Sequence, residues 1–261
     1  SKRRWLLMFN LMYLIGTLVL LSFSTFNLAG EKIQSAANTH PNITFYTESY
    51  PPANYMEQNK LVGISVDMLK LMWAEQGISE QQISMVSWNR GYRKVLKSPN
   101  TALFTISRTP AREHLFKWVG PLFQSNHVLF AKKSSNLKFQ NLSDVLSHSV
   151  ATIHGDISEI SLQQIGFPDY NMAKADNLER AFRMMESDRV EMIMVSIHGF
   201  EHLSKLLNID TSDYEQVWKV NQFGNYIGFN VNTPDSVIQK YQQAFNSVKS
   251  HSHSIRQKYM N

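Results

Sequence analysis

The chain has 261 residues, of which 43% are hydrophobic and 18% charged, and it contains no cysteine. This composition is that of a globular protein, long enough for one large domain or two small ones. The formal net charge is +5, but Lys2, Arg3 and Arg4 stand apart at the N-terminus, so charge gives no argument for a nucleic-acid partner. The lack of cysteine excludes disulfides and cysteine nucleophiles.

The N-terminus has the pattern of an export signal. A basic start, Ser1-Lys2-Arg3-Arg4, precedes an apolar run over residues 6–23 that carries no charge. This order of a cationic and an apolar segment is typical of a secretory signal peptide. The run is also close to the length that spans a bilayer. We therefore predict that residues 1–37 are a signal peptide or an uncleaved membrane anchor. Because the exported protein has no disulfides, we expect it in a bacterial periplasm.

The chain from residue 43 onward alternates short apolar runs with helical patterns. Strands are predicted at 43–47, 83–88 and 101–107, and helices at 61–77 and 90–98, with a helical turn from Pro110. Hydrophobic spacing and breakers such as Gly77 support these boundaries. Strands that alternate with helices over short connections predict a parallel sheet with helices on its faces.

The same rhythm then repeats. Strands are predicted at 127–133, 150–153, 190–197 and 226–231. Helices are predicted at 142–146 (capped by Ser143), 158–166 (closed by Gly166), 177–189 (capped by Asn177, with Glu179 paired to Arg183) and 236–250. Two similar α/β units predict an α/β protein with two lobes, residues 41–124 plus 230–261 forming lobe one and 125–229 lobe two. Hinge strands are expected near 124–126 and 228–230.

The stretch TISRTPARE (105–113) ends a predicted buried strand with hydroxyls and a guanidinium. Thr109 suits a helix N-cap and Pro110 the first helical position. Arg112 is unexpected there, because the start of a helix favours anions. A surface salt bridge to Glu113 is one explanation. A ligand site is the other, since open α/β sheets bind ligands at the carboxyl ends of their strands, where HGDIS (154–158) also falls.

Four blocks in order carry a family resemblance: TESYPP…NKLVGISVDMLKLM, ALFTISRTPAREHLFKWVGPLF and VATIHGDISE, behind the export signal. From about Ile43 to Ile255 the chain resembles the family 3 extracellular solute-binding proteins, the periplasmic receptors of polar amino acid uptake. The resemblance implies the two-lobed periplasmic binding protein fold (type II). It also implies a binding protein without catalysis or cofactor, which closes on its ligand and delivers it to a membrane permease of the ABC type.

The resemblance also implies a site. Arg112 would hold a ligand carboxylate with two hydrogen bonds, as a guanidinium fork can, helped by Ser107 and Thr109. Glu48 would meet a ligand cation and Tyr50 would cover the ligand, although a solvated loop charge and interlobe packing are alternatives. From lobe two, amides of the HGDIS loop would complete the contacts. The further candidates are Trp88, Gly155, Asp156, Ser158 and Ser196, where core packing is an equal explanation for Trp88.

Two positions depart from the family pattern. Asp156 stands where a small hydroxyl residue is common, so it either caps the following helix or receives a ligand amine. Ser196 stands where the family has the aspartate that binds the ligand's amino group. Since serine cannot neutralise an ammonium, either Glu48 or Asp156 takes this role or the ligand is not a standard α-amino acid.

The sequence gives weaker support to other functions. His198 and His202, four residues apart, lack the H-E-x-x-H order of zinc proteases, so no metal site is expected. His251 and His253 are interpreted as part of a solvated tail. The alternative function is a membrane-anchored sensor with the same cleft, and a scaffold without ligand is a third. We expect a monomer.

Overall fold

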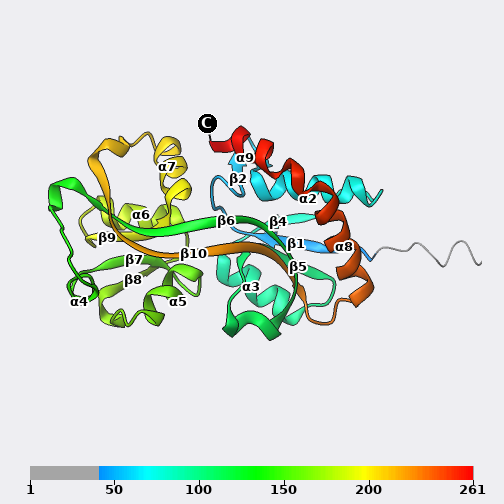
Figure 1. Cartoon of the computed structure of the whole chain (residues 1–261), viewed down its shortest axis with the longest axis horizontal. Coiled ribbons are helices and arrows are strands. Elements are labelled where there is room, and N and C mark those ends of the chain that lie inside the picture. The colour runs from blue at the N-terminus through cyan, green and yellow to red at the C-terminus, as the bar shows by residue number, and fades with distance from the viewer. Residues whose placement is uncertain (1–40, 261) are drawn as a thin grey trace, which may run out of the picture. The chain divides into compact units, whose positions relative to one another are not determined.

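The structure, a computed structural model, describes residues 41–260 (Figure 1). The predicted signal or anchor, residues 1–37, lies outside these described residues. Within the described part, no helix is long and apolar enough to cross a membrane.

One eight-stranded sheet forms the centre of the fold, in the order β4-β1-β5-β10-β6-β9-β7-β8. Strand β1 pairs in parallel with β4 and β5, and β7 pairs in parallel with β8 and β9. The fold is therefore α/β, with a parallel half at each end of the sheet. The strands are β1 (Thr44–Thr47), β4 (Ile83–Met85), β5 (Thr101–Ser107), β6 (Phe116–Lys132), β7 (Val150–Ile153), β8 (Met172–Ala175), β9 (Met192–Ser196) and β10 (Tyr214–Asn230), beside a separate hairpin of β2 (Tyr55–Glu57) and β3 (Lys60–Val62).

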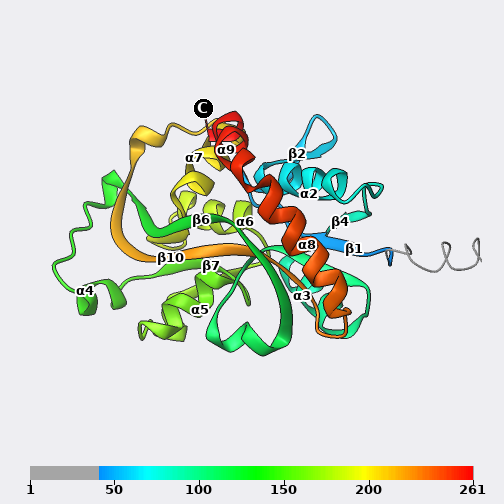
Figure 2. The ribbon, with the colours of Figure 1, turned by 45° about the vertical axis from the view of Figure 1, so that its right-hand side comes forward.

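Two long antiparallel strands, β6 and β10, connect the halves, as Figure 2 shows. Each has 17 residues. The sequence predicted only the apolar part of each, 127–133 and 226–231. The predictions fell short because polar residues that face solvent, such as Gln124 and Gln222, interrupt the apolar pattern. Of the expected hinge segments, 124–126 lies in β6 and pairs with 222–224 of β10. The second, 228–230, was misplaced, because Gly228 and Phe229 pair with β5 inside the first half.

Helices cover both faces of the sheet (Figure 1). In the first half, Phe45, Ala102 and Phe104 pack with the helices α2 and α8, while Leu103 and Ile106 face α3. In the second half, α6 and α7 cover one face and α4 and α5 the other. The helices are α2 (Ile64–Glu75), α3 (Trp88–Lys97), α4 (Leu142–Leu146), α5 (Ile157–Gln164), α6 (Leu178–Glu186), α7 (Ile197–Leu206), α8 (Asp235–Val248) and α9 (Ser252–Met260).

Several local predictions need correction. Trp88 starts α3 and does not end a strand, since β4 stops at Met85. Asn141, not Ser143, caps α4, because the Asn141 side chain accepts from the Asp144 amide. The predicted tail is a helix, α9, anchored by the buried Ile255.

The predictions for α6 are confirmed. The side chain of Asn177 accepts from the Arg180 amide and caps the helix. The side chains of Glu179 and Arg183 form an ion pair one turn apart, at 2.7 Å.

Candidate ligand-binding site

The site forms where β5 and β7 end, one from each half of the sheet. Ser107 is the last residue of β5, and a short 3-10 turn (Pro110–Leu115) follows it. Strand β7 ends at Ile153, and the turn through Gly155 leads into α5. The strand ends that the sequence singled out therefore lie on opposite sides of one buried region.

Arg112 lies at the centre of this region with only 2% of its surface exposed. Its guanidinium donates to the carbonyl oxygens of Ser107 (3.2 Å) and Gly155 (3.1 Å). It also lies over the rings of Trp88 and Tyr92, at 5.1 and 5.4 Å from their centres, a geometry that favours a cation.

The surface salt bridge considered for Arg112 is not formed. Arg108 is the residue that pairs with Glu113, through two hydrogen bonds. The Arg108 guanidinium also lies 5.6 Å from the ring centres of Trp118 and Tyr226. Arg108 thus takes the surface role, and Arg112 is left for the buried one.

Two buried carboxyl groups, those of Glu48 and Asp156, interact electrostatically with the Arg112 guanidinium. Burial raises the pKa of Glu48 well above its usual range, repulsion from Asp156 raises it further, and the Arg112 charge lowers it. Burial also raises the pKa of Asp156, which Arg112 and the amides of α5 oppose. One guanidinium therefore faces two acids, and the region holds a surplus of negative charge when both are ionised.

Thr109 offers an unused hydroxyl beside Arg112. It occupies the N-cap position that the sequence predicted, but its side chain makes no capping hydrogen bond. Its carbonyl accepts from the Arg112 amide at 3.0 Å. The Thr109 Oγ1 atom is buried and has no partner among the described residues. Since buried hydroxyls are normally satisfied, this atom is suited to a ligand.

The Gly155 turn contacts α3 closely. Trp88 Nε1 donates to the Gly155 carbonyl at 2.8 Å. Gly155 has a φ of +72°, and a Cβ there would lie 2.6 Å from Asn89 Oδ1. The left-handed backbone therefore favours glycine, and any larger residue would also have to displace the Asn89 side chain.

The residues that follow Gly155 start α5. Asp156 is the N-cap residue of α5 by its backbone, without a side-chain capping bond. The Ser158 hydroxyl accepts from the Ile153 amide at 3.0 Å and donates weakly to Asp156 at 3.5 Å. Ser158 thus supports the turn, while the Asp156 carboxyl stays near Arg112.

Tyr50 and Ser196 form a second link between the halves. The Tyr50 hydroxyl donates to Ser196 Oγ (3.2 Å) and accepts from the Ser196 amide (3.3 Å). Ser196 also caps α7 by accepting from the Gly199 amide. The buried His127 ring lies 3.5 Å from the Tyr50 hydroxyl, and burial lowers its pKa to about 4. Near neutral pH this cluster is uncharged.

Hydrogen bonds of the Asn54 side chain hold the loop that carries Glu48 and Tyr50. The fully buried Asn54 donates to the Glu48 carbonyl at 2.6 Å and accepts from the Thr105 hydroxyl. Thr105 has a φ of +61° at a β-bulge of β5 against β10, an uncommon backbone for a β-branched residue. The strained position directs its hydroxyl to Asn54 and Ser65.

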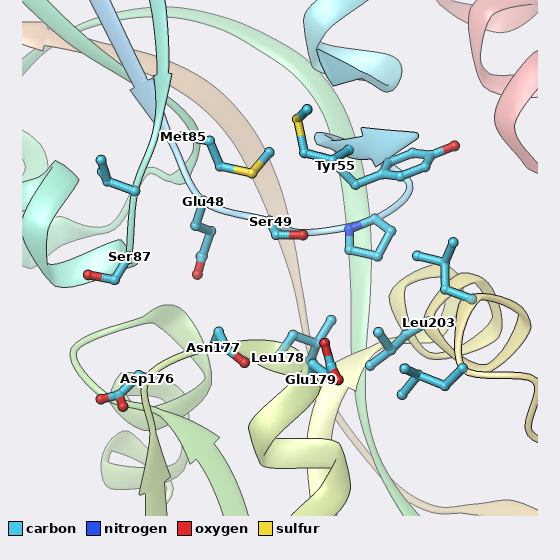
Figure 3. A pocket seen from close by; sticks show the side chains of 15 residues that line it. Glu48, Ser49, Tyr55, Met85, Ser87, Asp176, Asn177, Leu178, Glu179 and Leu203 are labelled. Carbon is cyan, nitrogen blue, oxygen red and sulfur yellow. The ribbon is translucent and has the colours of Figure 1, made fainter. Parts of the chain in front are cut away.

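A cavity of about 450 Å³ opens beside this region. Figure 3 shows Glu48 pointing into it, with Asp176, Asn177 and Glu179 on the facing wall. Arg112 and Gly155 do not line it. Glu48, which lines the cavity and feels the charge of Arg112, connects the two. The apolar lining is formed by Pro51, Tyr55, Met56, Met85, Val86, Leu178, Leu203, Leu206 and Leu207.

All ten predicted site residues lie in this region, but the sequence analysis missed several neighbours. Tyr92 follows Trp88 by one helical turn, a spacing that puts both rings on one side of α3, and this signal was available. Asn89, His127, Asp176 and Glu179 carry no local signal, because they reach the site through contacts distant in sequence.

The two histidines of α7 have separate partners. His198 pairs with Glu201 at 3.2 Å, whereas the His202 ring packs edge-on against Tyr55. Over residues 41–260, no group of three side chains is arranged to hold a metal ion.

Comparison with known proteins agrees with this geometry. The model of the bacterial extracellular solute-binding proteins, family 3, matches residues 43–261. The chain belongs to this family. It is therefore a solute-binding protein of an exported class, and the family is not a class of enzymes. None of the curated proteins matches the chain in sequence.

Several solved structures share the fold of this solute-binding protein. An ancestral arginine-binding protein bound to arginine is 18% identical, covering 86% of this chain and 100% of that chain, with a TM-score of 0.73. A histidine kinase sensor domain with similarity to periplasmic binding proteins is 15% identical (85% and 97% covered, TM-score 0.77). A Streptococcus pneumoniae ABC uptake transporter protein with bound histidine is 16% identical (83% and 91%, 0.74). At these identities the likeness shows the two-lobed fold.

Proposed function

We propose that this protein captures a small ligand with a carboxylate group, an amino acid or a relative of one. The observation that carries the proposal is Arg112, a guanidinium buried to 2% exposure between rings and carbonyls, with the unpartnered Thr109 hydroxyl beside it. The Arg112 guanidinium donates hydrogen bonds to the Ser107 and Gly155 carbonyl oxygens, and no ion pair among the described residues joins it to a carboxylate. A ligand carboxylate would give it a bidentate partner.

The binding mechanism we propose is closure of two lobes, divided as the sequence predicted except that residues 225–229, which pair with β5, belong to lobe one. Ligand would first meet Arg112, Ser107, Thr109 and Tyr50 on lobe one. Gly155, Asp156 and Ser158 of lobe two would then complete the contacts, with β6 bending at 124–126 and β10 at the residues paired with them, 222–224. Because the ligand touches both lobes only in the closed state, it shifts the population toward that state.

The amine half of the site would use Glu48 or Asp156. Ser196 is engaged by Tyr50 and by the Gly199 amide, and it carries no charge. Trp88, held by the Gly155 carbonyl, would supply an aromatic wall. This arrangement supports a ligand whose positive group lies near Glu48.

The setting we propose is the periplasm, with delivery to an ABC-type permease in the inner membrane by the protein as a monomer. Family membership and the neighbours bound to arginine or histidine support this role. The same cleft would serve a sensor, as in the kinase sensor domain of similar fold, but no separate observation favours that alternative.

The test is a calorimetric screen of the full chain against amino acids and small carboxylates, with Arg112→Ala and the matched surface variant Arg108→Ala. We expect Arg112→Ala to weaken a carboxylate ligand by roughly 2–5 kcal/mol, as for removing one partner of a buried charge pair. Arg108→Ala should bind like the parent. Equal binding by all three proteins would contradict the assignment of Arg112.

A further inference from the structure

The cavity that Glu48 lines is mostly apolar. Of its fifteen lining residues, nine are apolar. Two lining acids at the start of α6 already have partners. Asp176 pairs with Arg180 at 3.0 Å. Glu179 pairs with Arg183 at 2.7 Å. Beyond Glu48, the wall therefore offers a ligand mainly apolar contacts.

The two ends of the cavity differ in polarity. Figure 3 shows Ser87 at one end and Tyr55 and Leu203 at the other. Ser87 directly precedes Trp88, and the Arg112 guanidinium lies 5.1 Å from the centre of the Trp88 ring. The polar end of the cavity thus adjoins the guanidinium. A ligand whose carboxylate is held by Arg112 would extend its other end toward the apolar part.

Two large hydrophobic side chains lie half exposed in the cavity wall, one from each half of the sheet. Met56 of β2 is 48% exposed, and Leu206, the last residue of α7, is 50% exposed. Exposed hydrophobic side chains that share a concave surface are typical of ligand sites. An apolar ligand group between them would remove both from water. Because this burial needs both halves, such a ligand would favour closure.

The inner wall of the cavity is preformed. Tyr55, Leu178 and Leu203 are each at most 5% exposed, and both leucines belong to the apolar cluster that packs α6 and α7. Figure 3 shows Tyr55 and Met85 on one side of the cavity and the two leucines on the other. The volume, about 450 Å³, lies within the roughly 300–1,000 Å³ of small-molecule sites. A polar side chain against this wall would lose hydrogen bonds to water without replacing them.

We infer that the ligand is an amino acid with a large apolar side chain, and that Met56 and Leu206 cover this side chain from the two halves. This inference rests on the proposed function. It names a ligand class that Arg112 alone does not select, since a guanidinium accepts any carboxylate.

Two matched pairs of probes test the side-chain class. L-Leucine and L-asparagine share a branched shape, and L-methionine and L-glutamine share an unbranched one. We expect calorimetry on the full chain to show the apolar member of at least one pair binding at least about tenfold tighter than its polar partner, because the amide would be buried without hydrogen-bond partners. L-Arginine, whose side chain ends in a cation, should also bind at least about tenfold more weakly than that apolar member.

Two further probes separate this inference from the proposed function. They are 3-methylbutylamine and 3-(methylsulfanyl)propylamine, which correspond to leucine and methionine without the carboxylate. Each should bind more weakly than its parent amino acid, because it gives Arg112 no anionic partner.

Variants assign the selectivity to the two half-exposed side chains. Met56→Gln/Leu206→Asn keeps both shapes and changes only exposed positions, so the fold should be retained. We expect it to lower the apolar-to-polar affinity ratio at least about threefold, while binding of the polar probe persists. The matched control is Val231→Asn, at a hydrophobic side chain that is 46% exposed outside the cavity lining, and it should leave the ratio unchanged.

Each other outcome is decisive. Asparagine, glutamine or arginine binding as tightly as the apolar probes would overturn the apolar ligand class while the carboxylate site stands. Amines as tight as their parent amino acids would overturn the carboxylate role of Arg112 while the apolar part of the site stands. An unchanged ratio in the double variant would overturn the assignment to Met56 and Leu206.

Discussion

Arg112 is the residue on which the site depends, and its charge also stabilises the groups around it. It keeps Glu48 and Asp156 from being two uncompensated buried acids. Each contact that it makes, to Ser107, to Gly155 and to the rings of α3, comes from a different segment. The Arg112 side chain is therefore expected to contribute both to ligand binding and to the stability of the fold.

Removal of the Arg112 charge should destabilise the protein. Arg112→Ala leaves two buried carboxyls without their cation, so we expect the free energy of unfolding at pH 7 to fall by about 3–5 kcal/mol. Loss of the arginine raises both folded-state pKa values further, and the folded state then binds protons, so the deficit should shrink at pH 5. Denaturant unfolding at both pH values measures this. A deficit that grows on acidification would contradict the account.

His127 should make the protein acid-sensitive. Its pKa falls from 6.5 to about 4 on burial, so the unfolded chain takes up a proton first as the pH drops. The stability that the neutral ring contributes is present above pH 6.5 and is lost by pH 4, by up to about 3 kcal/mol. Glu48 and Asp156, with raised pKa values, act in the opposite direction.

The comparison with His127→Gln isolates the histidine from these acids. Parent and variant are unfolded by denaturant at pH 7, 6, 5 and 4. The difference in unfolding free energy, parent minus variant, should decrease steadily over this range. A difference that stays constant would show that His127 does not titrate in this way.

At the element scale, helix starts place the functional groups. Helix α5 begins at the Asp156 turn and α7 begins at Ser196, so the second half presents two helix N-termini to the site. The Tyr50–Ser196 contact joins the α7 start to the first loop. A helix cap and a contact between the halves thus depend on one hydroxyl.

Ser196→Ala should therefore cost more than an ordinary exposed serine. It removes the acceptor for both the Gly199 amide and the Tyr50 hydroxyl, and we expect a loss of about 1–2 kcal/mol of unfolding free energy. The control is Ser143→Ala in α4, where Asn141 provides the cap and the loss should be under about 0.5 kcal/mol. Thermal unfolding of both variants compares them, and equal losses would refute the double role of Ser196.

The sequence predicted those elements whose information is local. Strands β5 and β7 were located at 101–107 and 150–153, as the structure has them, because each is a compact apolar run between breakers. The Ser107–Thr109–Arg112 motif was equally readable. The Asn54–Thr105 bond and the Tyr50–Ser196 bond were not, because their partners lie 51 and 146 residues apart. The approach of Asp176 and Glu179, just before and in the first turn of α6, to the cavity was missed for the same reason.

At the scale of the whole molecule, the two long strands β6 and β10 are the only described strands that pair across both halves of the sheet. Bending of these strands would move the halves with little change in the two apolar clusters that lie within one half each, α2 with α8 and α4 with α5. A third cluster, which holds both Leu103 and Phe182, has members in both halves. The Arg112–Gly155 and Tyr50–Ser196 contacts would break and re-form with that motion. A ligand that bridges Arg112 and the Gly155 turn would bias it.

The most direct test of this clamp is a distance measured between the halves with and without ligand. The chain has no cysteine, so spin labels can be placed at Ser79→Cys and at Tyr170→Cys, which is 88% exposed in the second half. Double electron–electron resonance on the full chain should show a distance distribution that shifts and narrows with an amino acid ligand, and that shift should disappear in Arg112→Ala. A distribution unchanged by a ligand that calorimetry shows to be bound would contradict closure of the two lobes.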